Sequence, residues 1–226
     1  MWKESIAVSE VTQATSETGQ AAYSHLVLRI YDFFVLGVYN RYLWRCPTSE
    51  LRALYDRNVR SRHLDIGVAT GYYLDHAHWP VPNPEITLVD LNPNCLAVAA
   101  RRIARFAPRT VQADALKPLP DLGRFSSVGL TYLLHCLPGT FPEKAVVFDN
   151  IKPLLAPNAR VFGATMVDDG KRGPIARMVN NRYNAKGFTS TRNDRLADVK
   201  VALEARFKDV RVELRGTVAV FEASAP

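Results

Sequence analysis

Cysteine is scarce in this sequence, and long apolar runs are missing from it. The three cysteines, Cys46, Cys95 and Cys136, lie far apart and are odd in number. This excludes a framework of disulfides and favours reduced, partly buried thiols in a cytoplasmic protein. No apolar run approaches the roughly 18 residues that a membrane span needs, because the longest, Phe33–Tyr39, is far shorter. We therefore expect a cytoplasmic protein with no membrane span.

The N-terminal segment also lacks the apolar stretch of a secretory signal. It is polar and rich in Ser and Thr, which predicts a flexible leader over residues 1–20. The rest of the composition is ordinary for a globular protein, with 47% hydrophobic and 23% charged residues. A chain of 226 residues with this composition predicts a single domain over residues 21–226.

The formal net charge of +7 could attract nucleic acid or another anionic partner. However, the arginines and lysines are interleaved with Asp and Glu, and no run of five basic residues occurs. This pattern favours a solvated basic surface over a nucleic-acid site. We therefore do not expect nucleic acid as the partner.

The apolar pattern alternates between helical and strand periods along the chain. Residues 21–55 have helical spacing, interrupted near Gly37 and closed by Pro47, and Thr48 can cap a short helix through Tyr55. Strands are predicted over residues 64–68, 86–91, 110–112, 126–132 and 160–166. One predicted helix follows the second strand and ends near residue 106. Two more helices are predicted over residues 142–155 and 194–207. Residues 210–215 and 217–223 form a hairpin around Gly216.

Strands that alternate with helices predict an α/β fold with a doubly wound, mostly parallel sheet. The terminal hairpin adds an antiparallel part to that sheet. Residues 21–57 are expected to form a helical cap, and residues 168–193 an inserted lid. In such sheets, ligands bind where the parallel strands end.

Small residues recur at every second position after an acid at the end of the first strand. The segment reads Asp65-Ile66-Gly67-Val68-Ala69-Thr70-Gly71, and small residues let a turn backbone approach a ligand closely. Asp90 ends the second strand, where a carboxylate can accept both hydroxyls of a ribose. Asp114 follows the third strand, in position to accept a hydrogen bond from an exocyclic amine, and Ala115 can pack on a base.

These three acids and the loop resemble the class I S-adenosylmethionine-dependent methyltransferases over about residues 60 to 170. The family's first motif is acid-x-Gly-x-Gly-x-Gly, and this sequence departs from it only at Ala69. The resemblance implies a Rossmann-like fold and S-adenosylmethionine as cofactor, with S-adenosylhomocysteine as product. It places Asp65 and Gly67 by the methionine part, Asp90 by the ribose and Asp114 by the adenine amine. The cofactor-binding residues that it implies are Asp65, Gly67, Ala69, Thr70, Gly71, Asp90, Leu91, Asn92, Asp114, Ala115 and Tyr132.

A nicotinamide-binding enzyme is the rival interpretation of the loop. Counted from Gly67, its Gly-x-Gly-x-x-Gly pattern requires glycine at positions 69 and 72, which here are Ala69 and Tyr72. That loop also grips a pyrophosphate, whereas an acid before the loop suits a ligand with a cationic ammonium. The pattern therefore favours the methyltransferase.

The segments YDFFVLG, DIGVATGYYLDH, LVDLNPN, YLLHCLPG and FGATM resemble a bacterial and fungal subgroup of small methyltransferases. The subgroup acts on small molecules, often in secondary metabolism. This implies methyl transfer by in-line displacement to an oxygen or nitrogen of a small aromatic or apolar acceptor. Two alternatives stay open: an RNA methyltransferase, or a cofactor-binding protein of this fold that no longer methylates. A monomer and a homodimer fit equally well.

His135 follows the fourth strand and is the candidate general base, because an ordinary imidazole titrates near neutral pH. A structural role in shaping the loop is the alternative. Tyr31, Phe34, His135 and Tyr183 are the candidate acceptor contacts. No metal is expected, because Asp75, His76 and His78 cannot face one ion from a helix. His25 and His63 have no evident companions in the sequence.

Overall fold

The computed structural model describes residues 32–170 and 172–226. Tyr31 and His25 therefore lie outside the described residues. The described part contains one sheet with the strand order β3-β2-β1-β4-β5-β7-β6. Its strands are β1 (Arg62–Ile66), β2 (Glu85–Asp90), β3 (Arg109–Gln112), β4 (Phe125–Thr131), β5 (Leu155–Met166), β6 (Lys208–Arg215) and β7 (Val218–Ser224).

The first five strands are parallel, and β7 runs antiparallel to both β5 and β6. This arrangement confirms the predicted doubly wound sheet with an antiparallel hairpin at its C-terminal end. The order reverses between β1 and β4, which places a topological switch point at the ends of these two strands. The glycine-rich loop follows β1 at that point.

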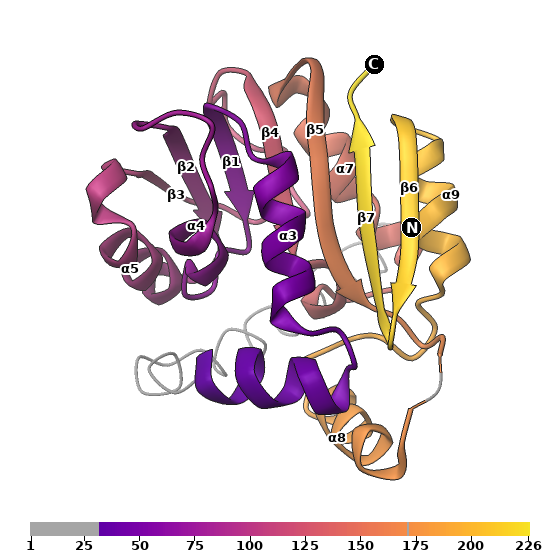
Figure 1. Ribbon diagram of the computed structural model, residues 1–226. Coiled ribbons are helices and arrows are strands. Elements are labelled where there is room, and N and C mark those ends of the chain that lie inside the picture. Colours follow the sequence, from indigo (N-terminus) through magenta and orange to yellow (C-terminus); the bar gives the residue numbers. More distant parts are fainter. Residues whose placement is uncertain (1–31, 171) are drawn as a thin grey trace, which may run out of the picture.

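Helices cover both faces of the sheet, with α3 in front and α7 behind in Figure 1. The front face carries α3 (Thr48–Asn58), α4 (Tyr72–His76) and α5 (Pro93–Arg102), followed by a short turn η2 (Ala104–Phe106). The back face carries η3 (Leu134–Cys136), α6 (Phe141–Lys144), α7 (Val146–Ile151), η4 (Lys152–Leu154) and α9 (Leu196–Glu204).

The central strands are buried on both faces, which explains their nearly continuous apolar sequences. Val161 and Phe162 are neighbours in β5 and both are fully buried, but they belong to the cores on opposite sides of the sheet. The edge strand β6 instead alternates exposed and half-buried residues. Charged side chains on such an edge discourage pairing with another chain.

The predicted break of the N-terminal helix near Gly37 is wrong. The helix η1 (Asp32–Leu43) is of the wide π type and runs through Gly37, and the chain bends at residues 44–47. A Cβ added at Gly37 would meet nothing within 4 Å. No neighbouring atom therefore requires glycine at this position, and nothing forces the helix to open there. Thr48 does not cap α3 either, because Pro47 precedes the helix and its first turn has no side-chain cap.

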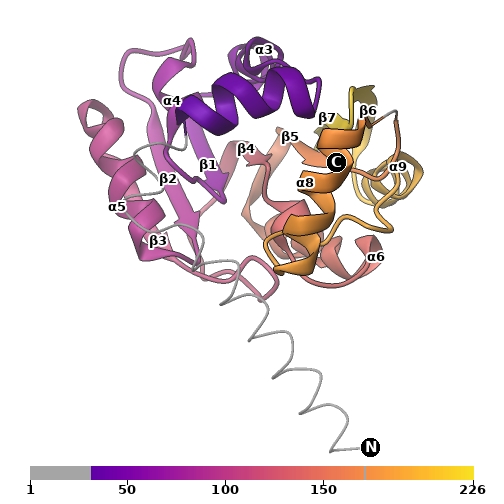
Figure 2. The ribbon, with the colours of Figure 1, turned by 90° about the horizontal axis from the view of Figure 1, so that it is seen from below.

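Two helices lie beyond the carboxyl ends of the parallel strands. The unlabelled indigo helix below α3 in Figure 1 is η1, and α8 (Pro174–Ala185) lies beside it, below the arrowhead of β5. In Figure 2 they border the ends of β1 and β4 on two sides. The sequence predicted the cap but not that residues 174–185 form a helix. None of the helices in the described ranges is long and apolar enough to cross a membrane.

Candidate cofactor site and its surroundings

The loop after β1 is built from three left-handed residues at alternate positions. Gly67, Ala69 and Gly71 have φ values of 76°, 45° and 71°, which explains why small residues recur there. A Cβ at Gly67 would lie 2.9 Å from Cδ1 of Leu133, and one at Gly71 would lie 3.1 Å from Cα of Ala99. Ala69 adopts the same region although its methyl group disfavours it.

Asp65, the acid before this loop, is held inside the protein with 3% exposure. Its Oδ2 accepts a hydrogen bond from the Tyr55 hydroxyl at 2.9 Å and lies 3.2 Å from Nε2 of His63. Gly129 makes room on the neighbouring strand, since a Cβ there would lie 2.6 Å from the same oxygen. His63, which seemed to lack companions in the sequence, therefore belongs to the support of this acid.

Asp90 ends β2 and accepts a hydrogen bond from the backbone amide of Asn92 at 2.9 Å. Burial raises the pKa of its carboxyl group to about 6, and hydrogen bonds from the amides of Asn92, Ala69 and Val68 limit the rise. The glycine-rich loop therefore contacts the second acid directly. At neutral pH the group is mostly ionised and can accept hydroxyl donors.

Asp114 follows β3 in a turn, and its Oδ1 accepts a hydrogen bond from the Leu116 amide at 3.0 Å. The next residue, Ala115, is buried with 6% exposure. An acid and a small apolar surface thus stand together after the third strand, as the sequence predicted.

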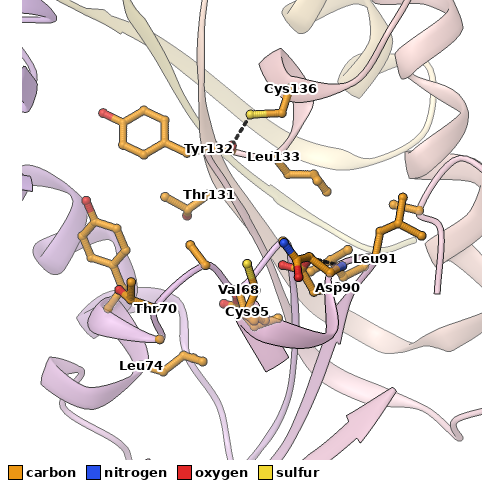
Figure 3. A pocket seen from close by; sticks show the side chains of 18 of the residues that line it. Val68, Thr70, Leu74, Asp90, Leu91, Cys95, Thr131, Tyr132, Leu133 and Cys136 are labelled. Carbon is orange, nitrogen blue, oxygen red and sulfur yellow. Dashed lines mark hydrogen bonds between the residues drawn. The ribbon is translucent and has the colours of Figure 1, made fainter. Parts of the chain in front are cut away.

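One cavity joins the loop and all three acids. Figure 3 shows Val68, Asp90 and Thr131 among the side chains that line this cavity. Each of the eleven residues expected to bind the cofactor lines it: Asp65, Gly67, Ala69, Thr70, Gly71, Asp90, Leu91, Asn92, Asp114, Ala115 and Tyr132. The sequence missed other lining residues, among them Tyr55, Tyr73, Cys95, Leu133 and Cys136. Tyr73, Leu133 and Cys136 belong to segments that resemble the family but were given no role in the site, and Tyr55 and Cys95 lie on helices that carried no motif.

The chain turns sharply after β4, where Tyr132 has a φ of 61°. Its amide donates to the carbonyl oxygen of Ala164 at 2.7 Å, and its own carbonyl oxygen accepts from Sγ of Cys136 at 3.6 Å (Figure 3). Its hydroxyl donates to Oδ1 of Asn40 at 3.0 Å. A left-handed tyrosine costs free energy and is found where the surrounding structure fixes it.

His135 is buried behind this turn and does not line the cavity. Its Nδ1 accepts a hydrogen bond from the Met166 amide at 3.4 Å, and its carbonyl oxygen accepts from the Ser190 amide at 2.8 Å. Burial, together with the nearby Lys144 ammonium, lowers the pKa of the ring to about 3. The ring is therefore neutral and only weakly basic, which favours the structural alternative that the sequence left open.

The other candidate acceptor contacts lie apart from this cavity or outside the described part. Tyr183 of α8 does not line the cavity; its ring centroid is 6.1 Å from that of Phe188. Burial and the hydroxyl of Tyr39 raise the pKa of Tyr183 to about 12, so η1 and α8 meet through these two tyrosines. Tyr31 and the side chain of Phe34 fall outside the described residues.

Asp75, His76 and His78, which the sequence suggested as metal ligands before their spacing was considered, make other contacts. Asp75 pairs with Arg105, and Nδ1 of His76 donates to the Tyr72 carbonyl oxygen at 2.8 Å. His78 lies with its Nδ1 3.0 Å from a carboxylate oxygen of Asp56. Nδ1 of His76 also lies 3.9 Å from a carboxylate oxygen of Asp75, but His78 is directed at Asp56, so the three side chains do not converge on one point.

Comparison with known proteins gives the class of this site. A family model described as a methyltransferase domain matches residues 64–161. The demethylluteothin O-methyltransferase of Streptomyces thioluteus is 39% identical over 209 residues, which cover 91% of this chain and 90% of that protein. The physcion biosynthesis cluster O-methyltransferase of Aspergillus chevalieri is 40% identical over 215 residues, covering 93% and 96%.

Solved structures agree on the fold. The DhpI complex with S-adenosylhomocysteine superposes with a TM-score of 0.67 at 15% identity, over 93% of this chain and 96% of that chain. The N-methyltransferase NodS from Bradyrhizobium japonicum WM9, also bound to S-adenosyl-L-homocysteine, gives 0.57 at 16% identity, over 79% and 85%.

The sheet, its glycine-rich loop and the three acids define a class I methyltransferase. With relatives at this identity over nearly its whole length, the chain belongs to the S-adenosylmethionine-dependent methyltransferases, alongside O- and N-methyltransferases of secondary metabolism.

Proposed function

We propose that the cavity binds S-adenosylmethionine across the three acids and that the chain methylates a hydroxyl oxygen of a small, flat acceptor. One observation carries the first part: the eleven residues expected from the sequence all line one cavity. In this assignment Asp65 faces the methionine ammonium, Asp90 accepts the ribose hydroxyls and Asp114 accepts the adenine amine.

The electrostatics of the cavity support this orientation. S-adenosylmethionine is a cation at its sulfonium and ammonium groups, and Asp65, Asp90 and Asp114 provide the opposite charge. Ala115 offers the adenine an apolar surface. The left-handed loop lets the backbone approach the methionine part without side chains between them.

The relatives support oxygen as the acceptor atom, because the two relatives reported above are named as O-methyltransferases. A nitrogen acceptor is the second candidate, favoured by the N-methyltransferase vrtF of Penicillium aethiopicum, which is 36% identical over 186 residues, 81% of this chain and 78% of that protein. The proposed acceptor site lies between η1 and α8, next to Tyr132. The two helices border the strand ends there (Figure 2).

The cofactor supplies an activated methyl group, so the protein's task is to position the acceptor and exclude water. In this proposal Tyr132 and the helices η1 and α8 do both. His135 acts by holding the loop after β4 to β5 and to residue 190. The acceptor is an acidic hydroxyl compound that gives its proton to solvent before it enters the site, so its oxyanion takes the methyl group and no base is needed in the site. We expect the protein to act in the cytoplasm as a monomer or a homodimer, which light scattering distinguishes.

Calorimetry with S-adenosylhomocysteine tests the cofactor assignment. The wild type should bind, and Asp90→Ala should weaken binding by at least tenfold, since it removes hydrogen bonds to a charged group. Asp121→Ala is the matched control, because Asp121 is an exposed acid in the loop before β4. Absence of binding by the wild type, or equal effects of the two variants, would reject the assignment.

Incubation with S-adenosylmethionine and a panel of phenols, acidic enols and heteroaromatic amines tests the acceptor. Mass spectrometry should show the gain of one methylene unit on oxygen acceptors. Methylation of amines alone would replace the first candidate by the second. Competition by tRNA would favour an RNA substrate, and cofactor binding with no product across the panel would favour a protein that no longer methylates.

A further inference from the structure

Asn40 is a fully buried side chain of η1 that joins three other elements. Its Oδ1 accepts the hydroxyl of Tyr132 at 3.0 Å, and its Nδ2 donates to the hydroxyl of Tyr73 at 3.3 Å. The same Nδ2 donates to Oγ1 of Thr48 at 3.1 Å. The side-chain amide of Asn40 therefore connects η1, the cap helix, with α4, with α3 and with the turn after β4.

The two tyrosines that Asn40 contacts both line the cofactor cavity. Tyr132 forms the left-handed turn after β4. Tyr73 stacks on Tyr55 with ring centroids 5.2 Å apart and an angle of 15° between the planes, and Tyr55 donates to Asp65. The contacts of Asn40 thus reach two separate walls of the cavity, one of them next to the first acid.

We propose that Asn40 is a positioning residue: it fixes the rings of Tyr73 and Tyr132 and so makes cofactor affinity depend on the docking of the cap helix. The inference rests on the proposed assignment of the cavity to S-adenosylmethionine. A neutral amide suits this task because it donates and accepts at once, and two hydroxyls that face it are oriented without any burial of charge.

The backbone of the same residue has a separate structural role. The carbonyl oxygen of Asn40 accepts the amide of Cys46 at 2.8 Å and closes the bend between η1 and α3. This bond does not involve the side chain and persists in Asn40→Ala. The substitution therefore removes the contacts to the tyrosines while the bend keeps its own hydrogen bond.

Calorimetric titration with S-adenosylhomocysteine measures the effect on affinity. Asn40→Ala should weaken binding roughly 3- to 30-fold, as expected for the loss of two neutral hydrogen bonds that order the cavity wall. The matched control is Asn83→Ala, because Asn83 is exposed and lies just before β2, at the amino ends of the parallel strands. This variant should bind like the wild type. Thermal unfolding without ligand shows whether each variant is folded.

A double-mutant cycle separates positioning from a general loss of packing. Tyr132→Phe alone should weaken binding roughly 2- to 10-fold. The Asn40→Ala, Tyr132→Phe double variant should bind about as tightly as Asn40→Ala, because both substitutions remove the same bond. Fully multiplicative effects would overturn the proposal, as would unchanged affinity in Asn40→Ala. If Asn40→Ala does not fold, the pair Tyr73→Phe and Tyr132→Phe replaces it, and wild-type affinity in both would overturn the proposal.

Hydrogen exchange supplies a readout that a purely structural role would not change. In the wild type, S-adenosylhomocysteine should slow exchange of the amides of residues 32–43, and Asn40→Ala should lose this slowing although Asn83→Ala keeps it. No slowing in the wild type despite binding would reject the coupling. Failure of the wild type to bind at all would instead reject the cofactor assignment on which the inference rests.

Discussion

The hydroxyl of Tyr55 donates a hydrogen bond to Oδ2 of Asp65 at 2.9 Å, from the end of α3 to the interior of β1. The same oxygen lies 3.2 Å from Nε2 of His63, whose Nδ1 lies 2.8 Å from the hydroxyl oxygen of Ser127. One helix, α3, and two strands, β1 and β4, therefore hold the first acid in one orientation before any ligand arrives. A carboxylate fixed in this way loses less entropy when it meets an ammonium group.

Tyr55→Phe should lower the free energy of unfolding by about 1–3 kcal/mol, because it removes a hydrogen bond to a buried carboxylate. It should also weaken binding of S-adenosylhomocysteine, since Asp65 is then less well oriented. Urea denaturation followed by Trp fluorescence measures the first effect. Tyr42→Phe is the control, because Tyr42 is 68% exposed; equal stability of the two variants would contradict the prediction.

The sequence predicted those parts of the site that depend on local order along the chain. The small residues follow β1, and the three acids lie near the ends of β1, β2 and β3. Parallel strands bring these ends to one edge of the sheet. Tyr55 and Asn40 could not be found in this way. Their partners, Asp65, Tyr73 and Tyr132, lie on other elements, and no motif or period in the sequence marks such contacts.

The fold shows the same division. Buried strands such as β5 were predicted from their apolar runs, whereas α8 was not, because Ile175 and Met178 are exposed and Asn180 is buried. That reverses the usual helical pattern. Gly37 suggested a break because glycine lowers helix stability, but the bend lies at residues 44–47, where Cys46 bonds back to Asn40.

Ala69→Gly should raise the free energy of unfolding by about 0.5–1 kcal/mol, because Ala69 has a φ of 45° and glycine adopts that region without steric cost. Affinity for S-adenosylhomocysteine should change little. Ala97→Gly is the opposite control: Ala97 is exposed within α5, and glycine there should lower stability by about 0.5–1 kcal/mol. A loss of stability in both variants would show that the methyl group of Ala69 contributes packing that outweighs its strain.

Binding of S-adenosylhomocysteine should weaken as the pH falls below about 6. Burial raises the pKa of Asp90 to about 6, so the ionised form that accepts ribose hydroxyls dominates at neutral pH and becomes a minority near pH 5. If only that form binds well, affinity falls roughly tenfold between pH 7.5 and pH 5. Calorimetry from pH 7.5 to pH 5 measures this. Asp90→Asn should bind weakly at every pH with a flatter profile, and a slope equal to that of the wild type would assign the titration to another group.

His135 should make stability, and not the rate of methyl transfer, depend on pH. Burial and Lys144 lower the pKa of His135 from 6.5 to about 3, so the unfolded chain takes up a proton below about pH 6.5 that the folded protein refuses. The contribution of His135 to the free energy of unfolding is therefore fully present above this pH and is lost as the pH falls. The loss is about 2 kcal/mol between pH 7 and pH 5. Denaturation of the wild type and of His135→Asn at several pH values measures it as the difference in slope. Asn keeps an acceptor for the Met166 amide and cannot titrate. Parallel curves of unfolding free energy against pH for the two proteins would therefore contradict the lowered pKa. A turnover profile with a limb near pH 6.5 that disappears in His135→Asn would show that the histidine acts as a base.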